Sequence, residues 1–300
     1  MKIQNDRINI KLPESNHELE WMRFANAISD LELATKSTIS FDFGSSSFLK
    51  PSHFVVLACC VELLAHKFKC DFKFIGGEGG LNNHLANTKF KRYWTEGFDR
   101  DNFTLSHNST TLCLWHVSKS MIDQYGQQAQ KYFRNHYFSD KDLQPLSQSL
   151  VEAFNNIFDH SNSEIQGYVI TQYFPNIYKL TFAVCDFGDG IPNTINLFLE
   201  RNSKEKLPDN LAIEKSLERG MTIQSTPSNA GFGLANILDI SQNCKGKLTI
   251  FSRQGYFIKE HNKIKLSGIL SYPFKGTLII VELDTNSFDD YDTENDIYEF

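Results

Sequence analysis

The segment Asp186-Phe187-Gly188-Asp189-Gly190 combines two carboxylates with two glycines, directly after the apolar run Leu180–Val184. An apolar run of this length beside glycines predicts a buried strand that ends in a sharp turn, which places Asp186 at the strand's end. A buried carboxylate requires a hydrogen-bond donor. Glycine tolerates positive φ and lets a flat ligand approach the backbone closely. The segment therefore predicts a ligand site, although an isolated turn of this composition is more often an ordinary surface turn.

Three other segments carry polar groups at useful spacing. Residues 146–160 have apolar residues at helical spacing, and Glu152 and Asn156 lie four apart on one face of that helix. The run Asn229-Ala230-Gly231-Phe232-Gly233-Leu234 precedes a helical pattern, and a glycine-rich loop at a helix start offers free backbone N–H groups to phosphates. Near the end, Gly276-Thr277 opens the apolar strand Leu278–Leu283.

The order of these four segments resembles the GHKL ATPase superfamily, which includes gyrase B subunits, heat-shock 90 chaperones, histidine kinases and MutL. The likeness covers residues 140–284 and is closest to the ATPase domains of the anti-sigma-factor type. It implies an ATP-binding domain of the Bergerat type, with helices on one face of a mixed sheet. It also implies ATP and Mg²⁺ as cofactors.

The resemblance gives roles to the matching residues. Asp186 is expected to accept a hydrogen bond from the adenine amino group, with Thr277 beside it. Asn156 is the expected Mg²⁺ ligand, since a hard cation prefers oxygen, and Glu152 is the expected general base that orients water at the γ-phosphate. The other expected ATP-binding residues are Asp159, His160, Gly188, Gly190, Gly231, Phe232, Gly233 and Leu234.

Simpler interpretations remain open at several of these positions. Glu152 and Asn156 could be a solvent-exposed pair, and the neighbouring Asn155 could be either the exposed residue or a second contact. His160 fits a helix C-terminus stabilised by the helix dipole. Thr277 could be an ordinary strand residue. Asn229 stands where many GHKL proteins have a first glycine, and Asn tolerates positive φ better than most residues.

The N-terminal part alternates strands and helices and predicts a small α/β layer domain over residues 1–117. The predicted strands are Thr38–Phe43, Asp71–Ile75 and Thr111–Val117, and the predicted helices are His17–Leu33, Phe54–Phe68 and Leu81–Trp94. This half resembles STAS domains, which carry a phosphorylatable serine where Ser52 stands. Lys50, Pro51 and His53 depart from the STAS pattern, so we interpret Ser52 as a helix cap rather than a phosphoacceptor.

The whole chain is therefore expected to be α/β, an α+β sandwich of a STAS-like domain and a GHKL domain joined by a connecting helix over residues 118–139. Within the GHKL domain we expect a mobile lid at Thr222–Asn229 before the glycine loop. Strands Lys247–Ser252 and Tyr256–Lys259 are expected to meet at a hairpin turn at Gly255. Residues 285–300 are rich in acidic side chains and lack Lys and Arg, which predicts a flexible tail.

Composition limits the classes of function. The chain has 300 residues and a net charge of −6, and its 22% charged and 41% hydrophobic residues are ordinary globular values. We expect a soluble cytoplasmic protein, without a signal peptide or a membrane-spanning run. The six cysteines show no C-x-x-C pair, so neither zinc nor a disulfide framework is indicated. The dispersed basic residues do not indicate nucleic-acid binding.

Three functions fit these expectations. The first is an ATP-binding regulatory protein in which Mg²⁺-dependent hydrolysis drives lid closure, read by a regulatory or effector protein and accompanied by an ATP-dependent homodimer. The second is an anti-sigma-type serine/threonine kinase that acts on a STAS-like partner. The third is a non-catalytic nucleotide-binding interaction module. Because Glu152 matches a catalytic base, the first is preferred.

Overall fold

Two β-sheets organise the chain in the computed structural model, which describes residues 2–4, 7–33, 37–100, 110–118, 121–160, 162–219 and 233–291. Of residues 2–4, 122–123 and 158–160 it describes the backbone only. One sheet is formed by the N-terminal part and is largely parallel, and the other is antiparallel. The predicted combination of two α/β units is confirmed at this level.

The first sheet has the order β1-β2-β3-β4, with β1 antiparallel to β2 and the other pairs parallel. Parallel neighbours require crossover connections, which the helices provide. Strands β1 and β2 were not predicted from the sequence, although every second residue from Ile8 to Leu12 is apolar and buried on one face of β2 and just after it. The strands are β1 (Lys2–Gln4), β2 (Arg7–Lys11), β3 (Thr38–Asp42) and β4 (Asp71–Ile75), and the helices are α1 (Glu18–Ser29), α2 (Pro51–Phe68) and α3 (Gly79–Asn87), followed by the 3-10 helix η1 (Phe90–Arg92).

Two helix predictions in this half need correction. The expected helix over 81–94 is split into α3 and η1, with Lys89 between them at positive φ. The expected cap at Ser52 is also wrong, because Lys50 is the N-cap of α2, no side chain caps it, and Ser52 lies inside the first turn.

The second sheet has the order β5-β6-β7-β9-β8, and each of its described strand pairs is antiparallel rather than mixed. The expected strand at 111–117 belongs to this sheet, because β5 pairs with β6, so a boundary at residue 117 does not match the sheets. β8 runs through Gly255 without a hairpin, and the chain turns after Glu260 instead. The strands are β5 (Trp115–Val117), β6 (Gly167–Phe174), β7 (Lys179–Asp186), β8 (Lys247–Glu260) and β9 (Leu266–Asp284), with the 3-10 helix η3 (Pro175–Ile177) between β6 and β7.

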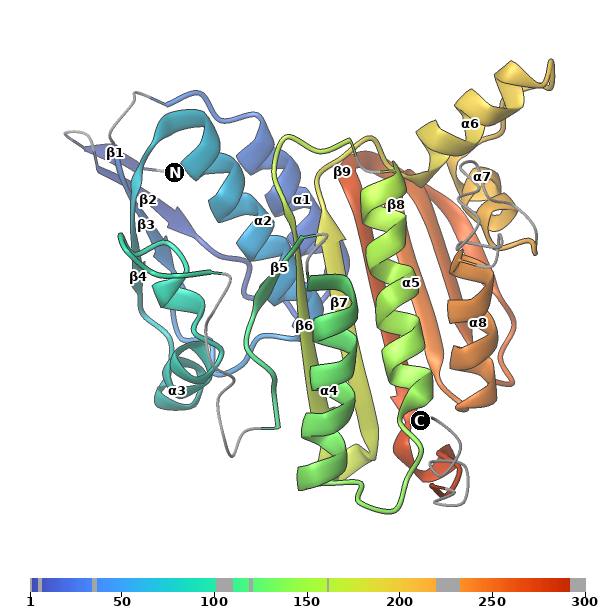
Figure 1. Cartoon of the computed structure of the whole chain (residues 1–300). Helices are drawn as coiled ribbons and strands as arrows, with labels where there is room; N and C mark the ends of the chain where they lie inside the picture. Colours follow the sequence, from blue (N-terminus) through green and yellow to red (C-terminus); the bar gives the residue numbers. More distant parts are fainter. Residues whose placement is uncertain are drawn as a thin grey trace.

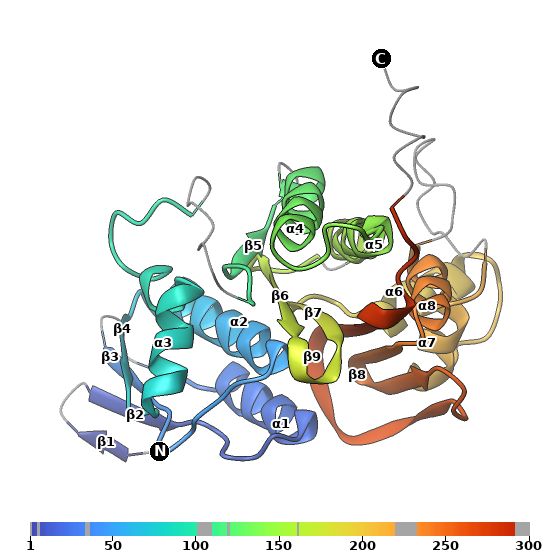
Figure 2. The same cartoon turned by 90° about the horizontal axis from the view of Figure 1, so that it is seen from below.

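Helices cover both faces of the second sheet, as seen along the strands (Figure 2). Helices α4, α5 and α8 lie on one face, and α2 and α1 lie on the other (Figures 1 and 2). Side chains of β7 alternate between the two cores: Phe182 and Val184 pack under α5, whereas Ala183 and Cys185 join the core around α2. The helices on the first face and at its end are α4 (Ile122–His136), α5 (Gln144–His160), α6 (Ile191–Arg201), α7 (Asp209–Ser216) and α8 (Gly233–Asn243).

α2 is the shared core helix of the two halves. Its Cys59 Sγ lies 3.3 Å from the carbonyl oxygen of Cys185 on β7. By length and composition α2 could cross a membrane, which contradicts the expectation of no membrane-spanning run, but 72% of this 18-residue stretch is buried inside the protein. This burial is that of a core helix in a soluble protein. The core on the α2 face of the second sheet is therefore shared by the two halves, whereas the core under α4, α5 and α8 belongs to the C-terminal half alone.

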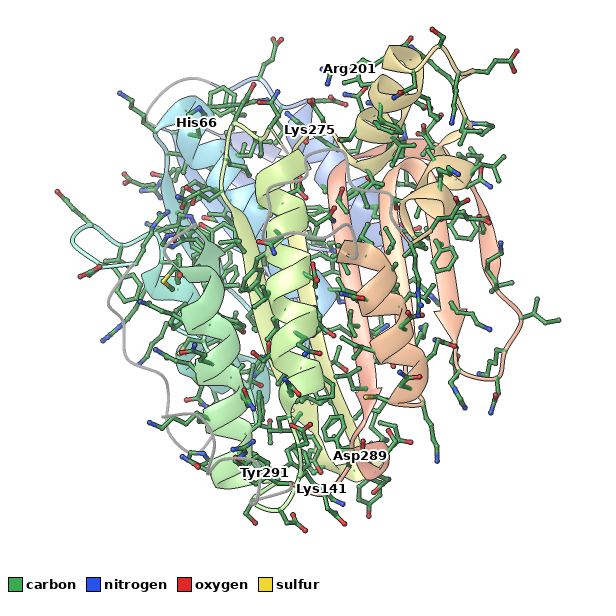
Figure 3. The ribbon with its side chains drawn as sticks, turned by 45° about the vertical axis from the view of Figure 1, so that its right-hand side comes forward. His66, Lys141, Arg201, Lys275, Asp289 and Tyr291 are labelled. Atoms are coloured by element: carbon green, nitrogen blue, oxygen red, sulfur yellow. The ribbon has the colours of Figure 1, made fainter. Side chains whose placement is uncertain are left out.

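The start of the acidic tail is docked rather than flexible. The 3-10 helix η4 (Thr285–Ser287) leads to Phe288, which is buried and packs edge-on against Phe138. Lys141 forms an ion pair with Asp290 at 2.6 Å, and Lys141, Asp289 and Tyr291 lie together at one end of the molecule (Figure 3). The remainder of the expected tail, from residue 292, lies outside the described residues.

Candidate functional site

Asp186 ends β7 as the sequence predicts, and it is 3% exposed. Burial raises the pKa of its carboxyl to about 7, because an ion loses water there. The backbone N–H of Gly188 donates to Asp186 Oδ1 at 2.7 Å, which lowers the pKa, and the nearby charge of Asp189 raises it. One backbone donor does not compensate for the lost solvation. The carboxylate is therefore a strong acceptor that is short of donors.

A row of buried polar side chains crosses three strands beside Asp186. Thr277 on β9 stands opposite Asp186, and Ser252 on β8 stands opposite Thr277. The Ser252 hydroxyl lies 2.9 Å from both Thr277 Oγ1 and the carbonyl oxygen of Gly276, and it accepts the Ile191 N–H at 3.0 Å. Ser252 thus ties β8 and β9 to the first turn of α6. Thr277 lies at Asp186, as expected, whereas Ser252 was missed because only strand pairing brings it there.

Two glycines let the backbone pass closely behind the carboxylate. Gly276 has φ +92°, and a Cβ atom there would lie 2.0 Å from the Asp186 carbonyl oxygen. Gly190 has φ +81°, and its Cβ would lie 2.8 Å from Ser252 Oγ. A side chain fits at neither position, because positive φ and contact both exclude it. The structure thus explains glycine at position 190 by the closeness of Ser252, and the expected contact of Gly190 with ATP stays a prediction.

α5 passes from the carboxylate to the start of α8. A Cβ on Gly167 would lie 3.0 Å from Ile157 Cδ1 on α5 and 3.5 Å from Asp186 Cβ, so this end of α5 is next to Asp186. Asn156 precedes Ile157 and is half-buried. One turn earlier, Glu152 is half-buried and its Oε1 accepts a hydrogen bond from Asn236 Nδ2 at 3.1 Å.

Glu152 also lies close to the glycine-rich segment. Its Oε2 is 3.9 Å from the position that a Cβ would take at Gly233, the first residue of α8. The structure therefore places Glu152 beside the start of α8. It places the C-terminal part of α5, with Asn156 and Ile157, beside Asp186. Asn236 was missed, since no sequence spacing relates it to Glu152.

Two cavities open at this site. One of about 400 Å³ borders the turn after β7 and is lined by Gly188, Asp189, Arg253, Lys275 and Gly276, among others. Lys275 lies at the end of the sheet where α5 ends (Figure 3). The other, of about 380 Å³, lies between α5 and α8 and includes Glu152 and Asn236. Each has the size of a small-molecule site.

Several expected site residues are not positioned by the structure. The side chains of Asp159 and His160, in the last turn of α5, are not described, and Gly231, Phe232 and the expected lid at 222–229 lie outside the described residues. Leu234 is described, and its side chain is buried in the core under α8 rather than open to a ligand.

The described residues contain no group of three or more His, Cys, Asp or Glu side chains that could hold a metal ion. Mg²⁺ in nucleotide sites is commonly held by one or two protein oxygens together with phosphates and waters. The half-buried Glu152 and Asn156, one turn apart on α5, supply oxygens of this kind. No protein-family model and no curated protein matches the sequence.

Proposed function

We propose that this chain is a cytoplasmic regulatory protein of the GHKL type that binds ATP with Mg²⁺ at the Asp186 site and hydrolyses it slowly. The observation that supports this most is the buried Asp186 carboxylate with its raised pKa and its single described donor. An adenine amino group is a neutral N–H donor, so it would fill the missing hydrogen bond without adding charge. Ser252 would keep Thr277 and Gly276 in place around it.

Glu152 is oriented for a role at the phosphates. Asn236 holds Oε1, which leaves Oε2 on the side of Gly233 for a water molecule. A carboxylate oriented in this way can accept a proton from that water. The N–H groups at the start of α8 would face phosphate oxygens. Mg²⁺, when bound, would neutralise phosphate charge, and the Asn156 amide oxygen would be its protein ligand.

The closed, ATP-bound state would be read by a regulatory or effector protein, and a homodimer formed only with ATP is part of this proposal. Phosphoryl transfer to a partner's serine or threonine, and nucleotide binding without catalysis, are the alternatives. They differ in the fate of the γ-phosphate.

The test is calorimetric titration with ATP and Mg²⁺, followed by phosphate release in the same samples. Asp186→Asn should weaken ATP binding at least tenfold, since it presents an amide to the adenine and loses the charge. Asp71→Asn, on exposed β4, is the matched control and should bind like the wild type. Glu152→Gln should still bind ATP but release phosphate at least a hundredfold more slowly.

Binding without phosphate release in the wild type would replace the ATPase proposal by the kinase or the non-catalytic module. If the wild type and Asp186→Asn bound ATP with equal affinity, the proposal that ATP binds at Asp186 would be wrong.

A further inference from the structure

A third cavity, of about 380 Å³, lies on the other face of the second sheet, where α2 begins. It is lined by residues of the first turn of α2 and of strands β7, β8 and β9. The residues that matter here are Pro51 and Ser52 of α2, Thr181 of β7, Phe251 of β8 and Ile280 of β9. The cavity thus joins the N-terminal half to the second sheet, away from Asp186 at the opposite end of β7.

The polar lining of this cavity has a positive surplus. Three lysines and two glutamates line it. Glu282 is shared between Lys179 at 2.9 Å and Lys247 at 3.3 Å, and Lys50 pairs with Glu18 at 2.9 Å. One lysine charge is therefore not neutralised by the lining carboxylates. Outside the lining, Glu260 and Asp284 also act on Lys179, so the cation nearest to an anion at the start of α2 is Lys50.

The N-terminus of α2 adds to this field. The first N–H groups of a helix have no partner within the helix, and the N-cap residue Lys50 supplies no side-chain cap. α2 has 18 residues, so its dipole places partial positive charge at the cavity. Backbone N–H groups at such a position bind phosphates and carboxylates.

Ser52 gives an independent sign of a missing ligand. It lines the cavity, is 2% exposed, and its hydroxyl has no hydrogen-bond partner among the described residues. The hydroxyl oxygen keeps contact with the open space of the cavity, so it is available to a ligand that enters. A ligand oxygen at the helix start would satisfy the hydroxyl and the free N–H groups together.

The rest of the lining is apolar. Phe251 and Ile280 lie within it, and Phe48, Phe174 and Ile177 stand at its mouth, where Ile177 is 59% exposed. Phe48 and Phe174 meet edge-on with ring centroids 6.2 Å apart, so the two halves touch at the rim. An inorganic ion would leave this apolar surface uncovered. A ligand with an apolar body would cover it.

We propose that this cavity is a binding site for a small organic anion, with a phosphate or carboxylate head at the start of α2 and an apolar body against Phe251 and Ile280. The site does not depend on the proposed nucleotide function. Its ligand would contact both halves of the chain.

The experiment uses the full chain and phenyl phosphate as the probe, with benzoate, inorganic phosphate and phenol for comparison. The readout is the NMR signal of each tryptophan indole. Trp21 follows Glu18 by one turn of α1 and stacks on His53 at 4.6 Å, so its signal reports on the cavity, whereas Trp94 and Trp115 lie elsewhere. Phenyl phosphate or benzoate should shift the Trp21 signal, and inorganic phosphate and phenol should bind at least tenfold more weakly.

Ser52→Ala and Lys50→Gln should each weaken phenyl phosphate binding about tenfold, which is the usual effect of removing a hydrogen bond to a charged group. Lys50→Gln lies at the surface, so it remains informative if Ser52→Ala lowers stability. Lys275→Gln, at the first site, and Asp186→Asn should leave the affinity unchanged, which separates this site from the nucleotide site.

The proposal would be overturned if phenyl phosphate shifted the Trp21 signal with the same affinity in Ser52→Ala and Lys50→Gln as in the wild type. The absence of binding at millimolar phenyl phosphate would overturn it as well. If inorganic phosphate bound as tightly as phenyl phosphate, the apolar half of the proposal would be wrong. If only Asp186→Asn lost binding, phenyl phosphate would be binding at the Asp186 site, and the proposal for the α2 cavity would be wrong.

Discussion

The hydroxyl of Tyr168 on β6 donates a hydrogen bond to Glu62 Oε2 on α2 at 2.7 Å, across the junction of the two halves. The same carboxylate receives two N–H···O bonds from Arg100 Nη1, at 3.0 and 3.1 Å, and one from Trp94 Nε1 at 3.0 Å. Glu62 is thereby satisfied by three partners in the C-terminal half of α2, away from the anion cavity at its first turn.

Tyr168→Phe should lower the free energy of unfolding by about 1 to 2 kcal/mol, because one buried hydrogen bond to a carboxylate is lost while the ring remains. Urea denaturation measures this. Glu62→Gln should cost more, since it leaves the Arg100 charge without its partner. The double variant should cost less than the sum of the two, and strict additivity would show that these side chains are not coupled.

Asp186→Asn should stabilise the protein without ligand at neutral and higher pH. Burial raises the pKa of the Asp186 carboxyl from 3.8 to about 7, so the folded wild type holds this proton more tightly than the unfolded chain does. The resulting contribution to the free energy of unfolding is complete below pH 4 and is lost as the pH rises to about 7. At about 1.4 kcal/mol per pKa unit, the loss is on the order of 4 kcal/mol. The difference in unfolding free energy between variant and wild type should grow from pH 4 to pH 7 and then stay constant. Denaturation at several pH values measures it, and a constant difference throughout would contradict the pKa shift.

Gly276→Ala should destabilise the chain by about 3 kcal/mol or more and displace the Asp186 backbone. Its Cβ would lie 2.0 Å from the Asp186 carbonyl oxygen, and φ is +92°. Gly79→Ala is the matched control, because a Cβ at that position, in the first turn of α3, meets nothing within 4 Å. Thermal denaturation should show a large loss for the first variant and little change for the second. Similar melting temperatures would refute the close approach.

His53→Phe should reduce the sensitivity of the protein to acid. Burial, and then the charge of Lys50, lower the pKa of His53 from 6.5 to about 3, and neither ring nitrogen has a partner among the described residues. A lowered histidine pKa contributes stability above pH 6.5 that is lost as pH falls toward 3. Phenylalanine keeps the stack on Trp21 and cannot be protonated. Between pH 7 and pH 4, the free energy of unfolding of His53→Phe should fall less steeply than that of the wild type. The control is His66→Gln, exposed on the same helix, whose free energy of unfolding should follow the wild type.

Local patterns predicted the elements that position the candidate site. The apolar run before Asp186 is β7, and the helical spacing around Glu152 is α5. β7 is buried on both faces and therefore appears as a continuous apolar run, whereas α5 is buried on one face and therefore shows the helical period. The alternation of Ile8 and Ile10 could have revealed β2 in the same way.

Long-range relationships could not be predicted in this way. The partners of Ser252 and the hydrogen bond from Asn236 to Glu152 depend on how distant segments pair. The same is true of β5, whose sequence fits either sheet, and of β8, which continues through Gly255 because β9 extends beside it. The cavity at the start of α2 exists only after two halves of the chain have met, so no local spacing indicates it.

The position of α2 has a consequence during synthesis of the chain. Cys59 contacts Cys185, 126 positions later. At 5 to 20 residues per second, a ribosome needs roughly 6 to 25 s to make that stretch. For that time the face of this apolar helix that packs on β6 and β7 has no partner, although the first sheet is already made. We therefore expect the nascent chain to depend on a chaperone until β6 and β7 emerge, and slower translation between the two segments should lower the yield of folded protein.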